Sequence, residues 1–140
     1  APGSTHEKLR RGAKWPVVME NMKFAGELSA RGDVELYELV FTVQYDNYRE
    51  MGDAVDLAKA VGAQRIFFAR LTNWGTFSQA QFAQNAVFMP SHAEYGAFIE
   101  AMQDERLRDP IVMLGDLEEF VEPLARPAPV AGARATALAG

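Results

Sequence analysis

The chain of 140 residues contains no cysteine. This absence excludes a disulfide framework, a cysteine-based zinc site and an iron–sulfur cluster held by thiolates of this chain. Histidine is scarce as well, and the only two, His6 and His92, lie far apart, so we expect no metal site. No apolar run approaches the roughly 18 residues of a membrane span, and no charged-then-apolar leader opens the chain. We therefore expect no membrane segment and a cytoplasmic location.

Basic charge is also limited. The 14 Lys and Arg residues are outnumbered by 19 Asp and Glu residues, which gives a formal net charge of -5. Nucleic-acid binding depends on clustered basic side chains, so we expect no nucleic-acid partner. The sequence has no Ser-His-Asp signature, no glycine-rich phosphate loop and no HExxH motif, so hydrolytic chemistry is not indicated.

What is present is enough apolar character, 49% of the residues, to bury one core. We assign residues 1–122 to a single domain. After Pro123 the aromatics vanish and alanine, proline and glycine dominate, so residues 123–140 are predicted to form a disordered tail.

Hydrophobic periodicity and terminal signals predict helices and strands in alternation. Capping-box patterns at Ser4–Glu7 and Ser91–Glu94 predict two helix starts. The expected helices cover approximately residues 4–11, 15–31, 54–61, 79–85 and 95–102, with one further helical turn at 118–121, and the expected strands cover 37–45, 65–71 and 111–114. This order is typical of a parallel α/β fold, and the apolar strands are expected to be buried on both faces.

Three parallel strands leave both edges of a sheet open. Either another polypeptide segment completes this sheet, or it is a small open sheet whose edges are covered by helices.

Polar residues gather where the first strand ends. Thr42 and Gln44 share the face opposite Leu39, Phe41 and Val43, because side chains alternate along a strand. They either bond to each other or to water, or they face a ligand.

The loop that follows carries Asn47 and Glu50. Asn47 suits a turn or a helix cap, and Glu50 at a helix start is favoured by the helix dipole. Hydrogen bonds to a polar small molecule at the carboxyl edge of the sheet explain both residues equally well.

The second strand ends at Arg70, which is followed by Asn73 and Trp74. A guanidinium at this position suits a carboxylate or phosphate clamp, and the alternative is an ion pair with Asp46 or Glu50. Trp74 either stacks on a ligand ring or covers the core.

A succession of segments resembles the C-terminal half of a radical S-adenosylmethionine (radical SAM) barrel. Two motifs carry the likeness: an N-x-x-E-M pattern after one strand, at Asn47–Met51, and an N-W-G loop after the next, at Asn73–Gly75. The likeness covers approximately residues 4–116, in the segments STHEKLRRG, KWPVVMENMKF, FTVQYDNYREMGDAVDLAKAVGAQRIFFARLTNWGTFS, AVFMPSHAEYGAFIEAM and DPIVMLGDL.

The resemblance implies a parallel-strand half-barrel, whose three strands correspond to the last three of a partial (β/α)6 TIM barrel. It implies SAM as cofactor, with Gln44, Asn47, Arg70 and Asn73 as the SAM-binding candidates. Thr42, Glu50 and Trp74 are then candidates for the substrate or the rim, with Lys14 or Trp15 also at the rim. The substrate, whether a small molecule or a peptide, is not indicated.

The chain departs from this family in one respect. The family binds a [4Fe-4S] cluster through a CxxxCxxC loop, and no cysteine is present here. The chain is therefore expected to be a fragment, a split or decayed gene product, or a half-barrel that assembles with the missing N-terminal half or with a second copy. The absence of an initiator Met and the unclosed sheet favour a fragment. The alternatives are a noncatalytic α/β binding or assembly module derived from that fold, and an unrelated small α/β domain.

Overall fold

A computed structural model describes residues 2–121 of the chain. Its centre is a parallel sheet of three strands in the order β1-β2-β3, namely β1 (Glu38–Val43), β2 (Arg65–Arg70) and β3 (Val112–Met113). Glu38 pairs with Arg65 at one end of the β1–β2 ladder, and Val43 pairs with Arg70 at the other. The α/β class and the parallel sheet predicted from the sequence are confirmed.

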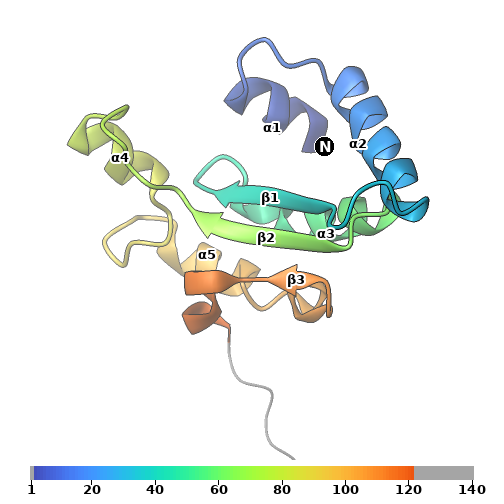
Figure 1. Ribbon diagram of the computed structural model, residues 1–140. Helices are drawn as coiled ribbons and strands as arrows, with labels where there is room; N and C mark the ends of the chain where they lie inside the picture. Colours follow the sequence, from blue (N-terminus) through green and yellow to red (C-terminus); the bar gives the residue numbers. More distant parts are fainter. Residues whose placement is uncertain (1, 122–140) are drawn as a thin grey trace, which may run out of the picture.

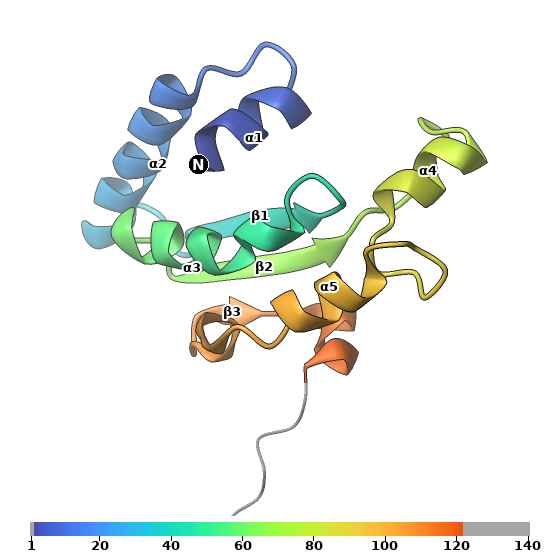
Figure 2. The same ribbon diagram turned by 180° about the vertical axis from the view of Figure 1, so that it is seen from behind.

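Helices α3 (Met51–Ala60) and α5 (Tyr95–Ala101) cover one face of the sheet (Figures 1 and 2). Helix α3 turns Ala54, Val55 and Ala58 inward, as the predicted periodicity requires. The largest fully buried side chains are Tyr48, Phe68, Phe98, Met51, Ile66, Met102, Leu117, Val43, Val55 and Val87.

Helices α1 (Pro2–Leu9) and α2 (Trp15–Ala30) form an arch beside β1, away from β2 (Figures 1 and 2). Helix α2 contains no buried residue over its 16 residues. Its contacts include a hydrogen bond from the Tyr37 hydroxyl to the Met22 carbonyl at 2.9 Å, the approach of Gly26 to the Val61 carbonyl, and a bond from the Trp15 N–H to the Glu7 carboxylate. The predicted stops at Gly32 and Gly62 are confirmed by their φ angles of +79° and +76°.

The remaining elements are short. The turn η1 (Tyr48–Glu50) precedes α3, and helix α4 (Gln79–Asn85) follows β2. The turns η2 (Glu105–Arg108) and η3 (Gly115–Phe120) flank β3. Among the described residues, no helix is both long enough and apolar enough to cross a membrane.

Both predicted capping boxes are wrong. Helix α1 begins at Pro2, so Ser4 lies inside it, and α5 begins at Tyr95 with Glu94 as an N-cap that makes no side-chain cap bond. A capping box forms instead at α4, where Ser78 and Gln81 bond reciprocally.

The prediction that every strand is buried on both faces is also wrong. The Val40 side chain is 61% exposed, because β1 is an edge strand with helices packed on one face only. The predicted tail, residues 123–140, lies outside the described residues.

Candidate functional site

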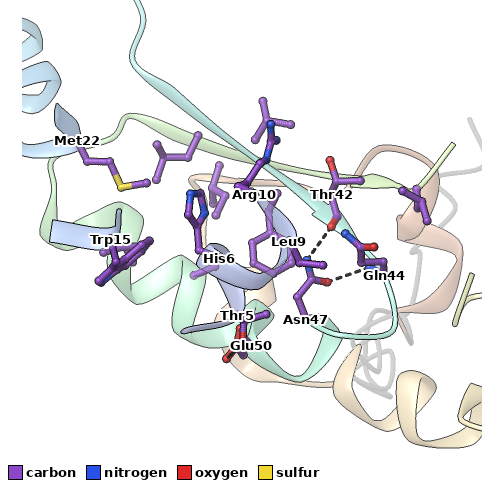
Figure 3. Close-up of a pocket in the computed structure, with 17 residues that line it drawn as sticks. Thr5, His6, Leu9, Arg10, Trp15, Met22, Thr42, Gln44, Asn47 and Glu50 are labelled. Carbon is purple, nitrogen blue, oxygen red and sulfur yellow. Dashed lines mark hydrogen bonds between the residues drawn. The ribbon is translucent and has the colours of Figure 1, made fainter. Parts of the chain in front are cut away.

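A cavity of about 420 Å³ lies along the free edge of β1, between this strand, α1, the start of α2 and α3 (Figure 3). Its walls combine apolar and polar side chains. The polar and aromatic lining residues are Thr5, His6, Arg10, Trp15, Thr42, Gln44, Asn47 and Glu50. Four of the seven candidates from the sequence, Thr42, Gln44, Asn47 and Glu50, are therefore brought together at one end of this cavity.

Asn47 is buried, with 7% of its surface exposed, and both ends of its amide are occupied. Its Oδ1 accepts a hydrogen bond from the Gln44 backbone N–H at 2.9 Å, and its Nδ2 donates to the Thr42 carbonyl at 2.9 Å (Figure 3). It precedes η1 but makes no side-chain cap bond, so the helix-capping explanation is wrong. Asn47 fixes the end of β1 and offers a ligand little free hydrogen-bonding capacity.

Glu50 is the N-cap residue of α3, at the helix start, but its side chain makes no cap bond. Its carboxylate accepts a hydrogen bond from the Thr5 hydroxyl at 2.8 Å, and Lys8 forms an ion pair with Asp46 at 2.7 Å. These two bonds fasten α1 to the loop that follows β1. Helix α1 therefore forms a wall of the cavity that is fixed at the carboxyl end of β1.

The amino-terminal wall of the cavity is aromatic and cationic. The rings of His6 and Trp15 lie 5.4 Å apart between centroids, and Arg10 also lines the space. Burial, assisted by the nearby charge of Arg10, lowers the pKa of His6 below its usual value of 6.5. A neutral imidazole beside an indole offers flat surfaces to a ring, and Arg10 offers a positive charge. His6, Arg10 and Thr5 have no local sequence signal as site residues, because the fold alone brings the amino-terminal segment to this cavity.

Arg70 lies on a different face from Thr42 and Gln44. It is paired with Val43 in the ladder and shares the side of the sheet that Ile66 and Phe68 occupy. Its guanidinium bonds to Glu119 and to the Asp116 backbone carbonyl, and it lies 4.9 Å from the Phe120 ring centroid. The predicted ion pair with Asp46 or Glu50 is therefore wrong, and Arg70 instead anchors η3 to the sheet.

Asn73 organises its own loop, outside the cavity. Its Oδ1 accepts bonds from the backbone N–H groups of Gly75 and Phe77, and its Nδ2 donates to the Phe77 carbonyl. Trp74 is 87% exposed, so the explanation that it covers the core is wrong.

A second polar cluster joins η1 to the start of α5. The Tyr48 hydroxyl donates to Glu94 at 2.6 Å, Arg49 forms an ion pair with the same carboxylate, and its guanidinium lies over the Tyr48 ring. Burial, followed by the bond to Glu94, raises the pKa of Tyr48 to about 12. The bonds from Tyr48 and Arg49 lower the pKa of Glu94. This cluster has no local sequence signal, because Glu94 lies 46 positions after Tyr48 and 45 positions after Arg49.

His92 stands next to this cluster, beside a shallow pocket. Its Nδ1 accepts from the Glu94 N–H at 3.0 Å, and its Nε2 lies 2.9 Å from the Gln84 carbonyl. The ring thus bridges two backbone segments before α5. Within residues 2–121, no group of three or more acidic or histidine side chains is placed to hold a metal ion.

Comparisons with protein-family models, with curated proteins and with solved structures found no match to this chain. Function is therefore inferred from the sequence motifs and from the geometry of the cavity beside β1.

Proposed function

We propose that this chain is the C-terminal part of a radical SAM enzyme barrel, in which β1, β2 and β3 are the last three strands of a partial (β/α)6 barrel. In this role it contributes contacts to SAM and to the substrate. One observation supports the proposal most: within residues 2–121 no strand pairs with the outer edge of β1, and a cavity with polar residues at the carboxyl end of the strand lies along that edge.

The cavity suits SAM in size and chemistry. Its volume of about 420 Å³ lies within the range of small-molecule sites. Gln44 and Thr42 supply hydrogen bonds, the His6 and Trp15 rings supply flat surfaces for a purine, and Arg10 supplies a charge for a carboxylate. We assign the direct contacts to these residues. Asn47 supports them by holding the end of β1, and Arg70 and Asn73 act by positioning η3 and the loop after β2.

The [4Fe-4S] cluster does not fit the residues of this chain, which has no cysteine. In the proposal another polypeptide segment binds the cluster, and radical formation depends on that segment. The residues of this chain would bind and orient SAM and the substrate and would enclose them in the cavity.

Isothermal titration calorimetry with SAM tests the proposal. We expect the chain to bind SAM weakly, and we expect Gln44→Ala to lower the affinity about tenfold, as the loss of one or two hydrogen bonds predicts. Gln79→Ala, at the exposed start of α4, is the matched control and should bind as the unaltered chain does. Absence of binding at millimolar SAM, or equal binding by both variants, would contradict the proposal.

The second candidate is a noncatalytic module that joins another chain through its sheet edge. The unburied surface of α2 beside the open β1 edge favours it. This candidate predicts that SAM does not bind. Sedimentation velocity tests its self-assembling form, because a monomer at every concentration excludes assembly with a second copy.

A further inference from the structure

The outer edge of β1 retains backbone groups that no strand of the described part of the chain uses. The Val43 carbonyl accepts from Leu71 N–H and the Tyr37 carbonyl accepts from Gln64 N–H, so the odd-numbered residues of β1 face β2. Backbone groups of successive strand residues point to opposite edges. The N–H and C=O groups of the even-numbered residues, Val40 and Thr42 among them, therefore point away from β2.

Asn47 occupies this outer edge at one end only. Its side-chain amide donates to the Thr42 carbonyl and accepts from the Gln44 N–H, as a peptide group of a neighbouring strand would (Figure 3). It thereby closes the edge at the carboxyl end of β1. The Thr42 N–H and both backbone groups of Val40 remain open toward the cavity.

The surroundings of these open groups suit an extended segment with apolar side chains. Leu9 of α1, Met22 of α2 and Leu39 of β1 line the cavity along the strand. Arg10 lines it as well, and within residues 2–121 no carboxylate forms an ion pair with Arg10. A segment that enters here would bind more tightly if it carried an acidic side chain facing Arg10.

We propose that the β1 edge takes up an extended, apolar and acidic segment of a different polypeptide as one added strand, and that Asn47 sets where this strand ends. The inference rests on the second candidate function, association through the sheet edge, and names its partner. The added strand and SAM would share Thr42, Arg10 and the cavity, so they are alternative occupants. Main-chain bonds to Val40 and Thr42 supply affinity, and the apolar walls and Arg10 supply selectivity.

Charge argues against two other occupants. Residues 2–14 carry four basic side chains, Lys8, Arg10, Arg11 and Lys14, against the single acidic Glu7. A second copy pairing symmetrically through β1 would bring two such basic helices to one interface.

The residues that follow Val121 are also poor candidates. They carry Arg126 and Arg134 against one acidic residue, Glu122, and Pro123, Pro127 and Pro129 lack a backbone donor. The described chain also ends beyond η3, on the β3 side of the sheet (Figure 1).

Amide hydrogen exchange, measured by NMR on the full chain with blocked hexapeptides, tests this proposal. The probe alternates valine and glutamate, and its control alternates valine and lysine. When the exchange rates are extrapolated to saturation with the glutamate peptide, we expect the Val40 and Thr42 amides to exchange at least about tenfold more slowly than in the free chain. The lysine peptide should bind at least about tenfold more weakly, because it meets Arg10 with like charge.

Three variants locate the contact. Val40→Pro removes a donor that faces away from β2, so it should weaken peptide binding, while Val40→Thr keeps the donor and should bind normally. Arg10→Gln should reduce the preference for the glutamate peptide over the lysine peptide. This variant tests the proposal by itself if V40P fails to fold.

Three results would overturn the proposal: no protection at Val40 and Thr42, equal binding of both peptides, or protection that rises with protein concentration alone, which would identify a second copy as the occupant. No SAM is present in this experiment, so its failure and a failure to bind SAM are separate results.

Discussion

Asn47 is a single buried side chain that satisfies two backbone groups at the end of a strand. Asn47→Ala would leave the Gln44 N–H and the Thr42 carbonyl without their partner. We expect the free energy of unfolding to fall by about 2 to 3 kcal/mol, the usual cost of stranding buried polar groups. Urea denaturation measures this change.

The nearly isosteric Asn47→Asp variant separates the loss of the hydrogen bond to Thr42 from the loss of side-chain volume. Its carboxylate still accepts from Gln44 but has no proton to donate to the Thr42 carbonyl, so we expect it to be destabilised at neutral pH. Protonation restores a donor, so N47D should approach the unaltered chain in stability as the pH falls. An N47A chain within about 0.5 kcal/mol of the original would show that water replaces the amide.

Tyr48 gives the protein a sensitivity to alkali. Its folded pKa of about 12 exceeds the ordinary value of 10.0, because burial and the bond to Glu94 favour the neutral phenol. Its contribution to stability is therefore complete below pH 10 and is lost as the pH rises from 10 toward 12. We expect Tyr48→Phe to remove this part of the alkaline loss, measured by urea denaturation across that range. Parallel alkaline losses in both proteins would contradict the assignment.

At the scale of elements, the contact between α2 and the end of α3 depends on a missing side chain. A Cβ at Gly26 would overlap the Val61 carbonyl oxygen, whereas a Cβ at Gly96 in α5 meets no atom within 4 Å. We expect Gly26→Ala to destabilise the protein by about 1 to 3 kcal/mol through overpacking. Gly96→Ala, the control, should be neutral or stabilising by up to about 1 kcal/mol. Thermal unfolding compares the two, and equal effects would mean that α2 shifts freely.

The elements that the sequence predicted best have local causes. Val55 and Ala58 repeat at helical spacing in α3, and Gly32 and Gly62 mark helix ends, so neighbouring residues alone decide these features. The helix starts were predicted less well, because a capping box requires backbone geometry as well as residue types. Before α5, the His92 ring accepts the Glu94 N–H instead of a Ser91 cap.

The site residues could be predicted only where local sequence determines their position. Thr42 and Gln44 reach the cavity because alternation along a strand determines their face. Arg70 instead bonds to Asp116 and Glu119, which follow 46 and 49 positions later, and Glu50 bonds to Thr5, 45 positions earlier. Such partners are set by the packing of distant elements, which local patterns do not encode.

Across the whole molecule, stability should be uneven. Helix α3 buries Met51, Gly52, Ala54, Val55 and Ala58, whereas α2 buries no residue. We expect the amides of α2 to exchange at least about tenfold faster than those of α3 in native-state hydrogen exchange, because few apolar contacts oppose local opening. Equal protection of the two helices would show that α2 is secured by contacts other than burial.

The shortness of β3 limits how this protein can associate. Its two residues, followed directly by η3, present little ladder for a further strand, whereas β1 presents a longer edge. Fibre growth requires each subunit to offer two complementary surfaces, one that receives and one that extends. A sheet with one receptive edge accepts a single addition and then stops, so the exposed edge of β1 carries little risk of open-ended polymerisation.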